Sequence, residues 1–323
     1  MSTGNQEALR SFVRGVTHNE VTLLPLNGDA SFRRYYRVAN SSLIAVDSPP
    51  DSQKNHEFVA IDKALLAAGI RVPQVLKVDF DRGFLLEEDL GDRTFAAVAR
   101  GKAQQEWYDK AVDLLPELAL CQVEGLPRFD EAFISRELGI FSQWMIEKRL
   151  HLDLSLSDGM MLEDTFAQLT SKCLRGPTCT MHRDYHSRNL LVTGDELAVI
   201  DFQDMVEGPL TYDLASLLFD CYVNLPEDLI QREIDRAYAG YRTAGLIDSG
   251  FSKEDFESQL YAVSLQRHLK VLGIFVRLSL RDGKDGYLKD LPRVLDYAIT
   301  ECRKLPAFES LGKFLQDNLS GKI

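Results

Sequence analysis

The sequence predicts an α+β protein with a small β-rich part followed by a larger, mainly helical part. Between residues 20 and 90, short apolar runs alternate with turn-forming residues, as in antiparallel strands joined by tight turns. From about residue 93 the apolar residues recur mainly at helical spacing over longer segments. We therefore expect an N-terminal lobe over 1–90 and a C-terminal lobe over 91–323.

The N-terminal lobe is expected to contain five strands and two helices. An amphipathic helix over 5–17 comes first, and a second helix, Asn55–Ala68, ends at Gly69, the residue type favoured just past a helix end. The strand patterns cover Val21–Leu26, Arg34–Val38, Leu43–Asp47, Gln74–Phe80 and Gly83–Glu88. They predict a small five-stranded antiparallel sheet with one inserted helix.

Helices dominate the C-terminal lobe. Their expected ranges are 93–123, 129–150, 160–174, 211–224, 227–244, 253–281 and 291–318. One exception lies inside these helical surroundings. The apolar runs Leu190–Val192 and Leu197–Ile200 are separated by the turn-forming stretch Thr193–Glu196, which predicts a β-hairpin.

Composition excludes several classes of protein. The 323 residues are 45% hydrophobic and 27% charged, as in ordinary globular proteins. A formal charge of −12 argues against general nucleic-acid binding, which needs a cationic surface. The five Cys form no CxxC pair and are expected to be reduced thiols. With no signal-peptide h-region and no apolar run of ~18 residues, we expect a cytoplasmic protein that uses no membrane.

Polar residues at the ends of the predicted hairpin suggest an active site. Asp184 and Asn189 are five residues apart, and Asp201 follows the second strand of the hairpin, which would bring Asn189 and Asp201 side by side. Two such oxygen ligands suit Mg²⁺, which keeps waters and also binds phosphate oxygens. Asp184 would then accept a proton from, or orient, an attacking hydroxyl. A solvated polar loop explains Asp195 and Glu196, but not polar residues at the ends of apolar strands.

Three segments resemble motifs of the aminoglycoside phosphotransferase family. They are HRDYHSRN over 182–189, IDFQD over 200–204 and GPLTYDLA over 208–215. The resemblance extends over nearly the whole chain and implies a bilobal protein-kinase-like fold that uses ATP and Mg²⁺. It implies that Asp184 is the catalytic base or hydroxyl-orienting group and that Asn189 and Asp201 bind the metal. His182 and Asp213 would brace the catalytic loop.

The N-terminal lobe carries further nucleotide-binding candidates. The stretch 27–38 resembles the hairpin that covers the phosphates in small-molecule kinases, and 84–92 resembles the segment between the lobes, where backbone groups bind adenine. The resulting nucleotide-binding candidates are Gly28, Asp29, Ala30, Ser31, Arg33, Glu57, Glu88 and Leu90.

One departure from the family pattern concerns the third strand, which normally carries a phosphate-binding Lys. Here the strand Leu43–Asp47 has none, although Glu57 is present on the following helix as the usual partner of that Lys. Either Arg33, Arg34 or Lys54 supplies the charge, or the protein is a nucleotide-binding pseudokinase. The intact Asp184, Asn189 and Asp201 favour an enzyme.

The acceptor is indicated by resemblance to one subgroup of the family. VDSPP over 46–50, the loop and metal motifs, and RHLKVLGIFVRL over 267–278 resemble bacterial kinases of peptidoglycan recycling. These kinases phosphorylate the anomeric C1 hydroxyl of N-acetylmuramate or N-acetylglucosamine. The resemblance implies a small amino-sugar substrate, and no obligate protein partner is inferred.

A cationic pocket would suit the lactyl carboxylate of N-acetylmuramate. At helical spacing, Arg267, Lys270, Arg277 and Arg281 fall on one side of a mostly apolar helix, where they either line a cavity or pair with acids. The remaining acceptor candidates are Arg183, His186, Arg188, Asp204 and Trp144. Asp204 could instead touch the water shell of the metal, and Trp144 could be a core aromatic instead of a sugar platform.

Several alternatives stay open. An aminoglycoside, choline-type or other small-alcohol kinase shares the catalytic motif but needs an acidic acceptor pocket. A protein kinase is disfavoured because no APE motif or long activation segment follows the metal motif. The sequence does not decide between N-acetylmuramate and N-acetylglucosamine, between ATP and GTP, or among oligomeric states.

Overall fold

The computed structural model of the chain describes residues 3–26 and 33–323, which form two units. The first unit comprises Met1–Trp107, Cys121–Glu124 and Arg188–Asp204, and the second comprises Tyr108–Leu120, Gly125–Ser187 and Met205–Ile323. Gly28, Asp29, Ala30 and Ser31 lie outside the described residues. The division of roles between 1–90 and 91–323 remains a prediction.

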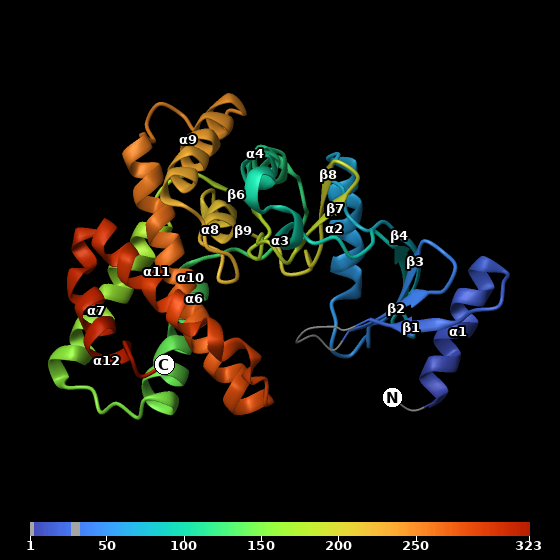
Figure 1. Cartoon of the computed structure of the whole chain (residues 1–323), viewed down its shortest axis with the longest axis horizontal. Helices are drawn as coiled ribbons and strands as arrows, with labels where there is room; N and C mark the ends of the chain where they lie inside the picture. The colour runs from blue at the N-terminus through green and yellow to red at the C-terminus, as the bar shows by residue number, and fades with distance from the viewer. Residues whose placement is uncertain (1–2, 27–32) are drawn as a thin grey trace. The chain divides into compact units, whose positions relative to one another are not determined.

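A five-stranded antiparallel sheet is the centre of the first unit, as predicted (Figure 1). Its spatial order is β1 (Leu23–Pro25), β2 (Arg34–Val38), β3 (Leu43–Asp47), β5 (Phe84–Glu88) and β4 (Val75–Asp79). The register places Tyr36 opposite Ala45, and Ala45 opposite Leu86. All three side chains are buried, which fixes the register, because a slip of one residue would expose them.

Two helices accompany the sheet. Helix α1 (Thr3–Thr17) contributes Leu9, Phe12 and Val13 to a core cluster with buried residues of β1, β2, β3 and β5. Helix α2 (Asn55–Ala67) buries Phe58, whose ring stacks on Phe202 at 4.8 Å between ring centroids. The stack fixes the segment that follows the hairpin to α2.

The predicted hairpin is present and belongs to the first unit. Strand β7 (Leu190–Thr193) pairs with β8 (Glu196–Val199), and Gly194 at the turn has φ +62°. A backbone hydrogen bond of 2.7 Å joins Val192 N–H to the carbonyl of Arg93, and one of 2.8 Å joins Val199 N–H to that of Arg71. The apolar runs are therefore strands because each is also hydrogen-bonded to a neighbouring segment.

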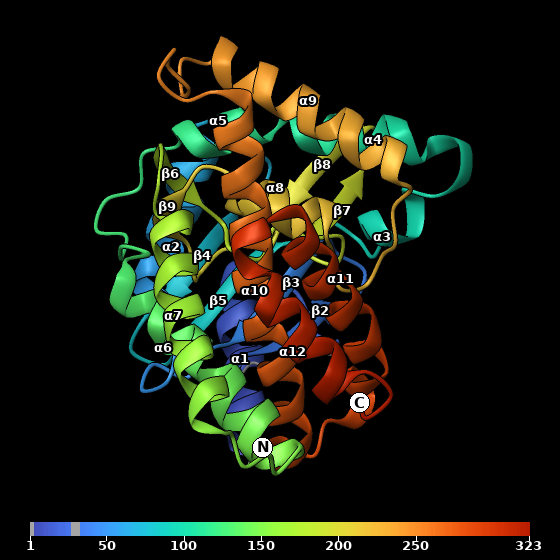
Figure 2. The same cartoon turned by 90° about the vertical axis from the view of Figure 1, so that its left-hand side faces the viewer.

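The second unit is mainly helical, and α10 (Lys253–Asp282) is its longest helix. Ser252 and Asp255 form a capping box at its N-terminus, and Gly283 ends it with φ +66°. The helix contacts α6, η2, α7 and α11 (Figure 2). The helices of this part are α4 (Gln104–Asp113), α5 (Leu115–Leu120), α6 (Glu131–Ile140), the π-helical η2 (Phe141–Arg149), α7 (Leu156–Cys173), α8 (Tyr212–Leu218), α9 (Glu227–Thr243), α11 (Leu291–Lys304) and α12 (Glu309–Leu319).

Two predicted helices are divided in the structure, and one strand pair was not predicted. The expected helix over 93–123 is instead α3 (Phe95–Val98), η1 (Gly101–Ala103), α4 and α5, because Gly101 takes φ +55° and Pro116 starts a new helix. Pro306 likewise divides 291–318, where η4 (Pro306–Phe308) separates α11 from α12. The short pair β6 (Thr178–Met181) and β9 (Val206–Pro209) was not predicted, because four-residue strands carry little periodicity.

A close backbone approach joins α10 to α6. A Cβ atom built on Gly273 would lie 2.4 Å from the carbonyl oxygen of Ile140. No side chain fits at that distance, so a glycine is required here.

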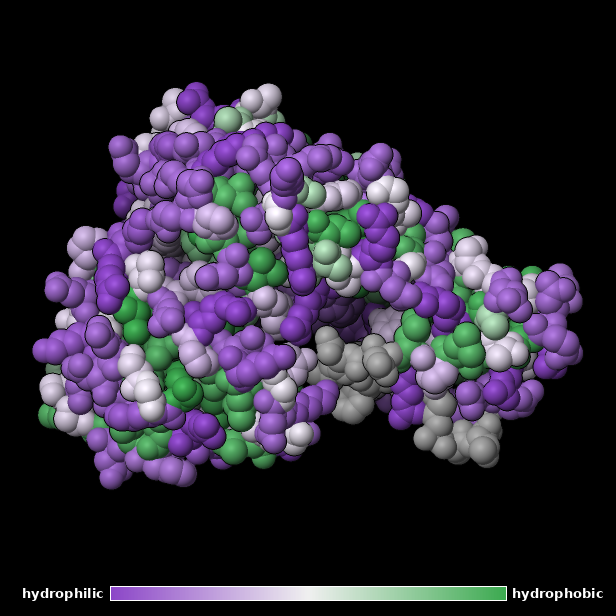
Figure 3. All heavy atoms as spheres, in the orientation of Figure 1, coloured by the Kyte–Doolittle hydropathy of each residue, from purple (hydrophilic) through white to green (hydrophobic). Residues whose placement is uncertain are grey.

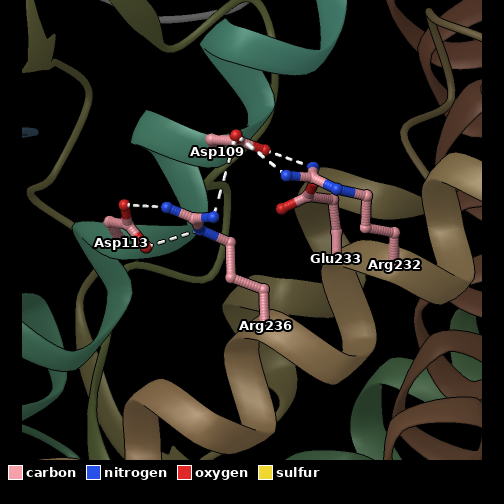
Figure 4. Close-up of polar contacts among 5 residues, drawn as sticks. All are labelled: Asp109, Asp113, Arg232, Glu233 and Arg236. Carbon is pink, nitrogen blue, oxygen red and sulfur yellow. Dashed lines mark hydrogen bonds and ion pairs between the residues drawn. The ribbon is translucent and has the colours of Figure 1, made fainter.

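Ion pairs connect α9 with α4 (Figure 4). Arg232 binds Asp109 through both terminal nitrogens, with Nη2 to Oδ2 at 3.0 Å, and it also contacts Glu233. Arg236 binds Asp113, with Nε to Oδ1 at 2.6 Å. Burial and the neighbouring Asp109 raise the pKa of Glu233 to about 7. The two arginines on α9 are one helical turn apart, as are the two aspartates that they bind on α4.

The face of the molecule in Figure 3 is mainly hydrophilic, with small separate apolar patches. Within residues 3–26 and 33–323, no helix is long and apolar enough to cross a membrane.

A buried ion pair links α10 to α11. His268 Nδ1 lies 2.8 Å from Glu301 Oε1, and Nε2 lies 3.0 Å from the carbonyl oxygen of Phe219. Burial opposes the charged imidazolium, but Glu301 and Cys221 outweigh it and raise the pKa of His268 to about 10. The ring also stacks on Tyr297 at 5.1 Å between centroids.

Because the pKa of His268 is raised, we expect the free energy of unfolding to decrease as the pH rises. The unfolded imidazole loses its proton near its ordinary pKa of ~6.5, whereas folded His268 keeps its proton until about pH 10. The pair's contribution is therefore complete below pH ~6.5 and falls by about 1.4 kcal/mol per pH unit up to pH ~10. Urea unfolding of His268→Gln and of the native chain should give a difference that shrinks over this range. A difference that stays constant over this range would contradict the assignment.

Candidate active site

The loop after β6 is held by the buried carboxylate of Asp213. Its Oδ2 accepts the backbone N–H of His182 at 2.6 Å, and its Oδ1 accepts that of Arg183 at 2.9 Å. Ser216 Oγ donates to the carbonyl of Arg183 at 3.1 Å. Arg183 has φ +74°, an uncommon conformation for a residue other than glycine, and these bonds maintain it.

A second carboxylate, Asp220, holds the end of the same loop. Its Oδ2 accepts the N–H of Ser187 at 3.0 Å, and its Oδ1 accepts that of Tyr222 at 2.7 Å. Between the two anchors, Tyr185 donates its hydroxyl to the carbonyl of Ala111 at 2.9 Å. Sequence reasoning missed Asp220, although an acidic residue within the apolar run after α8 is a usable signal.

Cations surround Asp184, which is half-buried. Burial alone would raise the pKa of its carboxyl, but Coulombic attraction from Lys270, His186, Arg183 and Arg267 outweighs burial and lowers it to about 2. The backbone N–H of Asp184 lies 3.3 Å from Nδ1 of His182, which is buried. Asp184 is thus an ionised hydrogen-bond acceptor at neutral pH.

Glu137 on α6 organises the cations. Its Oε1 lies 2.8 Å from Arg183 Nη2 and 3.4 Å from Lys270 Nζ, and its Oε2 accepts from Gln266 Nε2 at 2.8 Å. Burial would raise the pKa of Glu137, but Lys270 and Arg183 lower it. Sequence reasoning missed Glu137 because nothing in its local segment marks it.

Arg267 carries the most buried guanidinium of α10, with 3% of the residue exposed. Its guanidinium carbon lies 5.5 Å from the ring centroid of Tyr212, whose hydroxyl accepts from Lys270 Nζ at 3.2 Å. Within the described chain, Arg267 Nε and Nη1 have no hydrogen-bond partner. A buried guanidinium with two nitrogens that have no hydrogen-bond partner is suited to bind an anion.

The other candidate cations of α10 differ from Arg267. Arg277 is half-buried, and its Nε has no hydrogen-bond partner among the described residues. Arg281 is exposed, and its Nε lies 2.8 Å from Asp282 Oδ1. It therefore pairs with an acid, which was one of the two alternatives for these cations.

Two candidates for acceptor binding in the second unit, His186 and Trp144, have different neighbours. His186 is half-buried and lies edge-on to Tyr222 at 5.4 Å between centroids. Burial lowers its pKa, against the attraction of Asp220 and Asp184. Trp144 is half-buried on η2, and the ammonium of Lys148 lies 5.0 Å from its ring centroid.

Asn189 and Asp201 meet across the ends of the hairpin, as predicted. The carbonyl of Asn189 accepts the N–H of Ile200 at 3.0 Å, and Asn189 Nδ2 lies 3.5 Å from Asp201 Oδ2. Asp201 is exposed and has φ +65°. The described residues contain no cluster of three or more His, Cys, Asp or Glu suited to a metal. One amide oxygen and one carboxylate fit Mg²⁺, which takes few protein ligands, whereas Zn²⁺ needs more.

A pocket of about 980 Å³ opens beside these residues within the first unit. Its lining includes Arg33, Glu88, Leu90, Arg188, Asn189, Asp201 and Asp204. Arg188 and Asp204 therefore line this pocket. Glu57 is exposed on α2 and does not line it.

The segment after β5 is fixed on both sides. Arg71 Nη1 donates to Glu88 Oε2 at 2.6 Å, and a second bond joins the same two side chains. Thr193 Oγ1 on β7 lies 3.4 Å from the carbonyl oxygen of Leu90. These contacts join the sheet, the segment at 88–90 and the hairpin around one pocket.

The fold and these groups are those of an enzyme that transfers phosphoryl groups. Residues 22–247 match the phosphotransferase enzyme family, and the chain belongs to that family. A curated relative, the N-acetylmuramate/N-acetylglucosamine kinase of Pseudomonas aeruginosa, is 37% identical over 296 residues, which are 91% of this chain and 87% of the relative.

Two solved structures share the fold and confirm the predicted protein-kinase-like architecture. A choline/ethanolamine kinase family protein from Mesorhizobium loti matches with a TM-score of 0.68 and 13% identity, over 98% of this chain and 100% of that chain. The ADP-bound aminoglycoside phosphotransferase APH(2'')-Ib matches with a TM-score of 0.60 and 13% identity, over 92% and 98%.

The cations around Asp184 predict a shift in the pH profile when one is removed. Lys270→Met should raise the pKa of Asp184, so the pH below which kcat/KM falls should move upward by about one unit or more. The profile is measured with an uncharged acceptor, so that the acceptor itself does not titrate. Arg281→Met removes an exposed cation from the same helix and should leave the profile unchanged; an equal shift in both variants would contradict the assignment.

Proposed function

We propose that the chain is an amino-sugar kinase that transfers the γ-phosphoryl group of ATP to the anomeric C1 hydroxyl of N-acetylmuramate or N-acetylglucosamine. The name of the Pseudomonas aeruginosa relative supports the substrate class. The pocket of the first unit, with Glu88 and Leu90 at one part of its lining, supports nucleotide binding. A role in peptidoglycan recycling in the cytoplasm belongs to the same proposal.

The observation that carries the proposal is the ionised Asp184 within a cationic cluster. A carboxylate of low pKa accepts a hydrogen bond from a hydroxyl without being protonated itself at neutral pH. Because the anomeric hydroxyl is more acidic than an ordinary alcohol, a strong base is not required. Phosphoryl transfer depends mainly on positioning and charge, which this arrangement supplies.

In the proposed step, Asp184 orients the C1 hydroxyl and takes its proton as the oxygen forms a bond to phosphorus. The bond between the γ-phosphorus and the bridging oxygen breaks, and ADP leaves. We assign positioning roles to Asp213, Asp220 and His182, because their side chains accept backbone N–H groups of the loop. Only four residues separate Asp184 from Asn189 in the chain, so their Cα atoms lie at most about 18 Å apart.

Asn189 and Asp201 would hold Mg²⁺, which when bound neutralises charge on the phosphate oxygens. Asp204 lines the same pocket and remains a candidate for the water shell of the metal.

An anionic acceptor is favoured by the cationic cluster. Arg183 and Lys270 share Glu137, but Nε and Nη1 of Arg267 have no hydrogen-bond partner in the described part of the chain. The lactyl carboxylate of N-acetylmuramate is the group that would use them. Aminoglycosides and choline are cationic and would be repelled here, which argues against those alternatives.

The reaction itself is tested by ³¹P NMR of the product formed from N-acetylmuramate and ATP. We expect an anomeric 1-phosphate, and Asp184→Asn should lower kcat by at least about 100-fold with little change in nucleotide affinity. A 6-phosphate, or a product formed only from kanamycin or choline, would overturn the proposed acceptor. ATP binding without turnover across all these acceptors would favour the pseudokinase.

The role of Arg267 is tested by comparing two acceptors. Arg267→Gln should raise KM for N-acetylmuramate by about 10- to 100-fold, because a charge-assisted hydrogen bond to the carboxylate is lost. N-acetylglucosamine has no lactyl carboxylate, so its KM should change much less. Equal losses for both acceptors would show a structural role for Arg267 and contradict carboxylate binding.

A further inference from the structure

Arg33 stands out among the cations that line the pocket of the first unit. These cations are Arg33, Arg37, Lys54 and Arg188. Arg33 is 4% exposed, whereas Lys54 and Arg188 are exposed. Arg37 is committed to two carboxylates, with Nη1 to Asp92 Oδ2 at 2.9 Å and Nη2 to Asp89 Oδ1 at 3.1 Å.

The guanidinium of Arg33 is fixed in place by several groups. Nε donates to Ser48 Oγ at 3.0 Å, and that hydroxyl lies 2.6 Å from Asn55 Oδ1. The guanidinium carbon lies 4.2 Å from the ring centroid of Phe58. A cation held this firmly does not lose side-chain entropy when a ligand binds.

Gln203 connects Arg33 with the metal-binding end of the pocket. Arg33 Nη1 donates to Gln203 Oε1 at 3.3 Å, and Gln203 Nε2 donates to Asp201 Oδ1 at 2.7 Å. The amide therefore presents its oxygen to the cation and its nitrogen to the carboxylate. Because Asp201 lies at this end, Arg33 is at the same part of the pocket.

The charge of Arg33 is not cancelled by the buried carboxyl next to it. Glu87 on β5 also lines the pocket and is 5% exposed. Burial and Asp62 raise the pKa of Glu87 to about 8, although Arg33 opposes the shift. The carboxyl is consequently mostly neutral at pH 7.

We propose that Arg33 binds the nucleotide's phosphate groups in place of the lysine that β3 lacks, and that Gln203 couples it to Asp201. This inference rests on the proposed function for the identity of the ligand. Of the three candidates from the sequence, Arg34 is exposed and does not line the pocket. Lys54 lines the pocket but is exposed, and no described hydrogen bond joins it to the hairpin.

Calorimetric binding of ADP, AMP and adenosine in the presence of Mg²⁺ tests the assignment. Arg33→Met should raise the Kd for ADP by about 10- to 100-fold and that for adenosine less than about threefold, because only phosphate contacts are lost. Arg33→Lys should recover part of the ADP affinity. Arg34→Met is the matched control on the neighbouring residue and should leave every Kd unchanged.

Gln203→Leu tests the coupling. Leucine is similar in size to glutamine but cannot form the hydrogen bonds to Arg33 and Asp201. The substitution should weaken the Mg²⁺ dependence of ADP binding and leave adenosine binding the same. An ADP-specific loss in Lys54→Met but not in Arg33→Met would overturn the assignment. An equal loss of ADP and adenosine affinity in Arg33→Met would also overturn it, because such a loss would indicate a structural role for Arg33. Failure of the native chain to phosphorylate any amino sugar concerns the proposed function alone, since ADP binding is measured without an acceptor.

Discussion

The arrangement of the catalytic loop depends on one buried carboxylate. Asp213 accepts two consecutive backbone N–H groups, of His182 and Arg183, and so holds Arg183 in a backbone conformation that it would rarely adopt alone. Because the next residue is Asp184, this one interaction helps to determine where the carboxylate of Asp184 lies. Asp220 accepts the backbone N–H of Ser187 in the same way. Both ends of the loop are therefore held by carboxylates from the segment that starts with α8.

Charge in the second unit is organised around few acids and several cations. Glu137 is shared by Arg183, Gln266 and Lys270, while Arg267 packs against Tyr212. An excess of buried cations is costly unless an anion joins them. The attraction of these cations explains why Asp184 stays ionised. An acidic chain with a formal charge of −12 can therefore still hold a local anion site.

Much of the fold and part of the site could be predicted from the sequence. The five strands and the hairpin were predictable because alternating apolar residues and turn residues are local signals, and Asn189 and Asp201 follow directly from the hairpin. The breaks at Gly101 and Pro306 were missed because a helical pattern continued through them. Glu137 and Asp220 were not predictable as partners, since their roles arise from contacts 46 residues away for Arg183 and 33 for Ser187. Which cation could replace the missing lysine likewise required the contacts of Arg33 with Ser48 and Gln203.

The close approach at Gly273 has a consequence for the ion pair between Glu137 and Lys270. Gly273 fits against the carbonyl of Ile140, three residues beyond Glu137, and it is itself three residues beyond Lys270. The contact between Gly273 and Ile140 thus sets the spacing between α6 and α10. It lies about one turn from the ion pair between Glu137 and Lys270. A larger residue at position 273 would separate the helices and lengthen that ion pair without touching a substrate. The ion pair between Lys270 and Glu137 therefore depends on a packing contact that bears no charge.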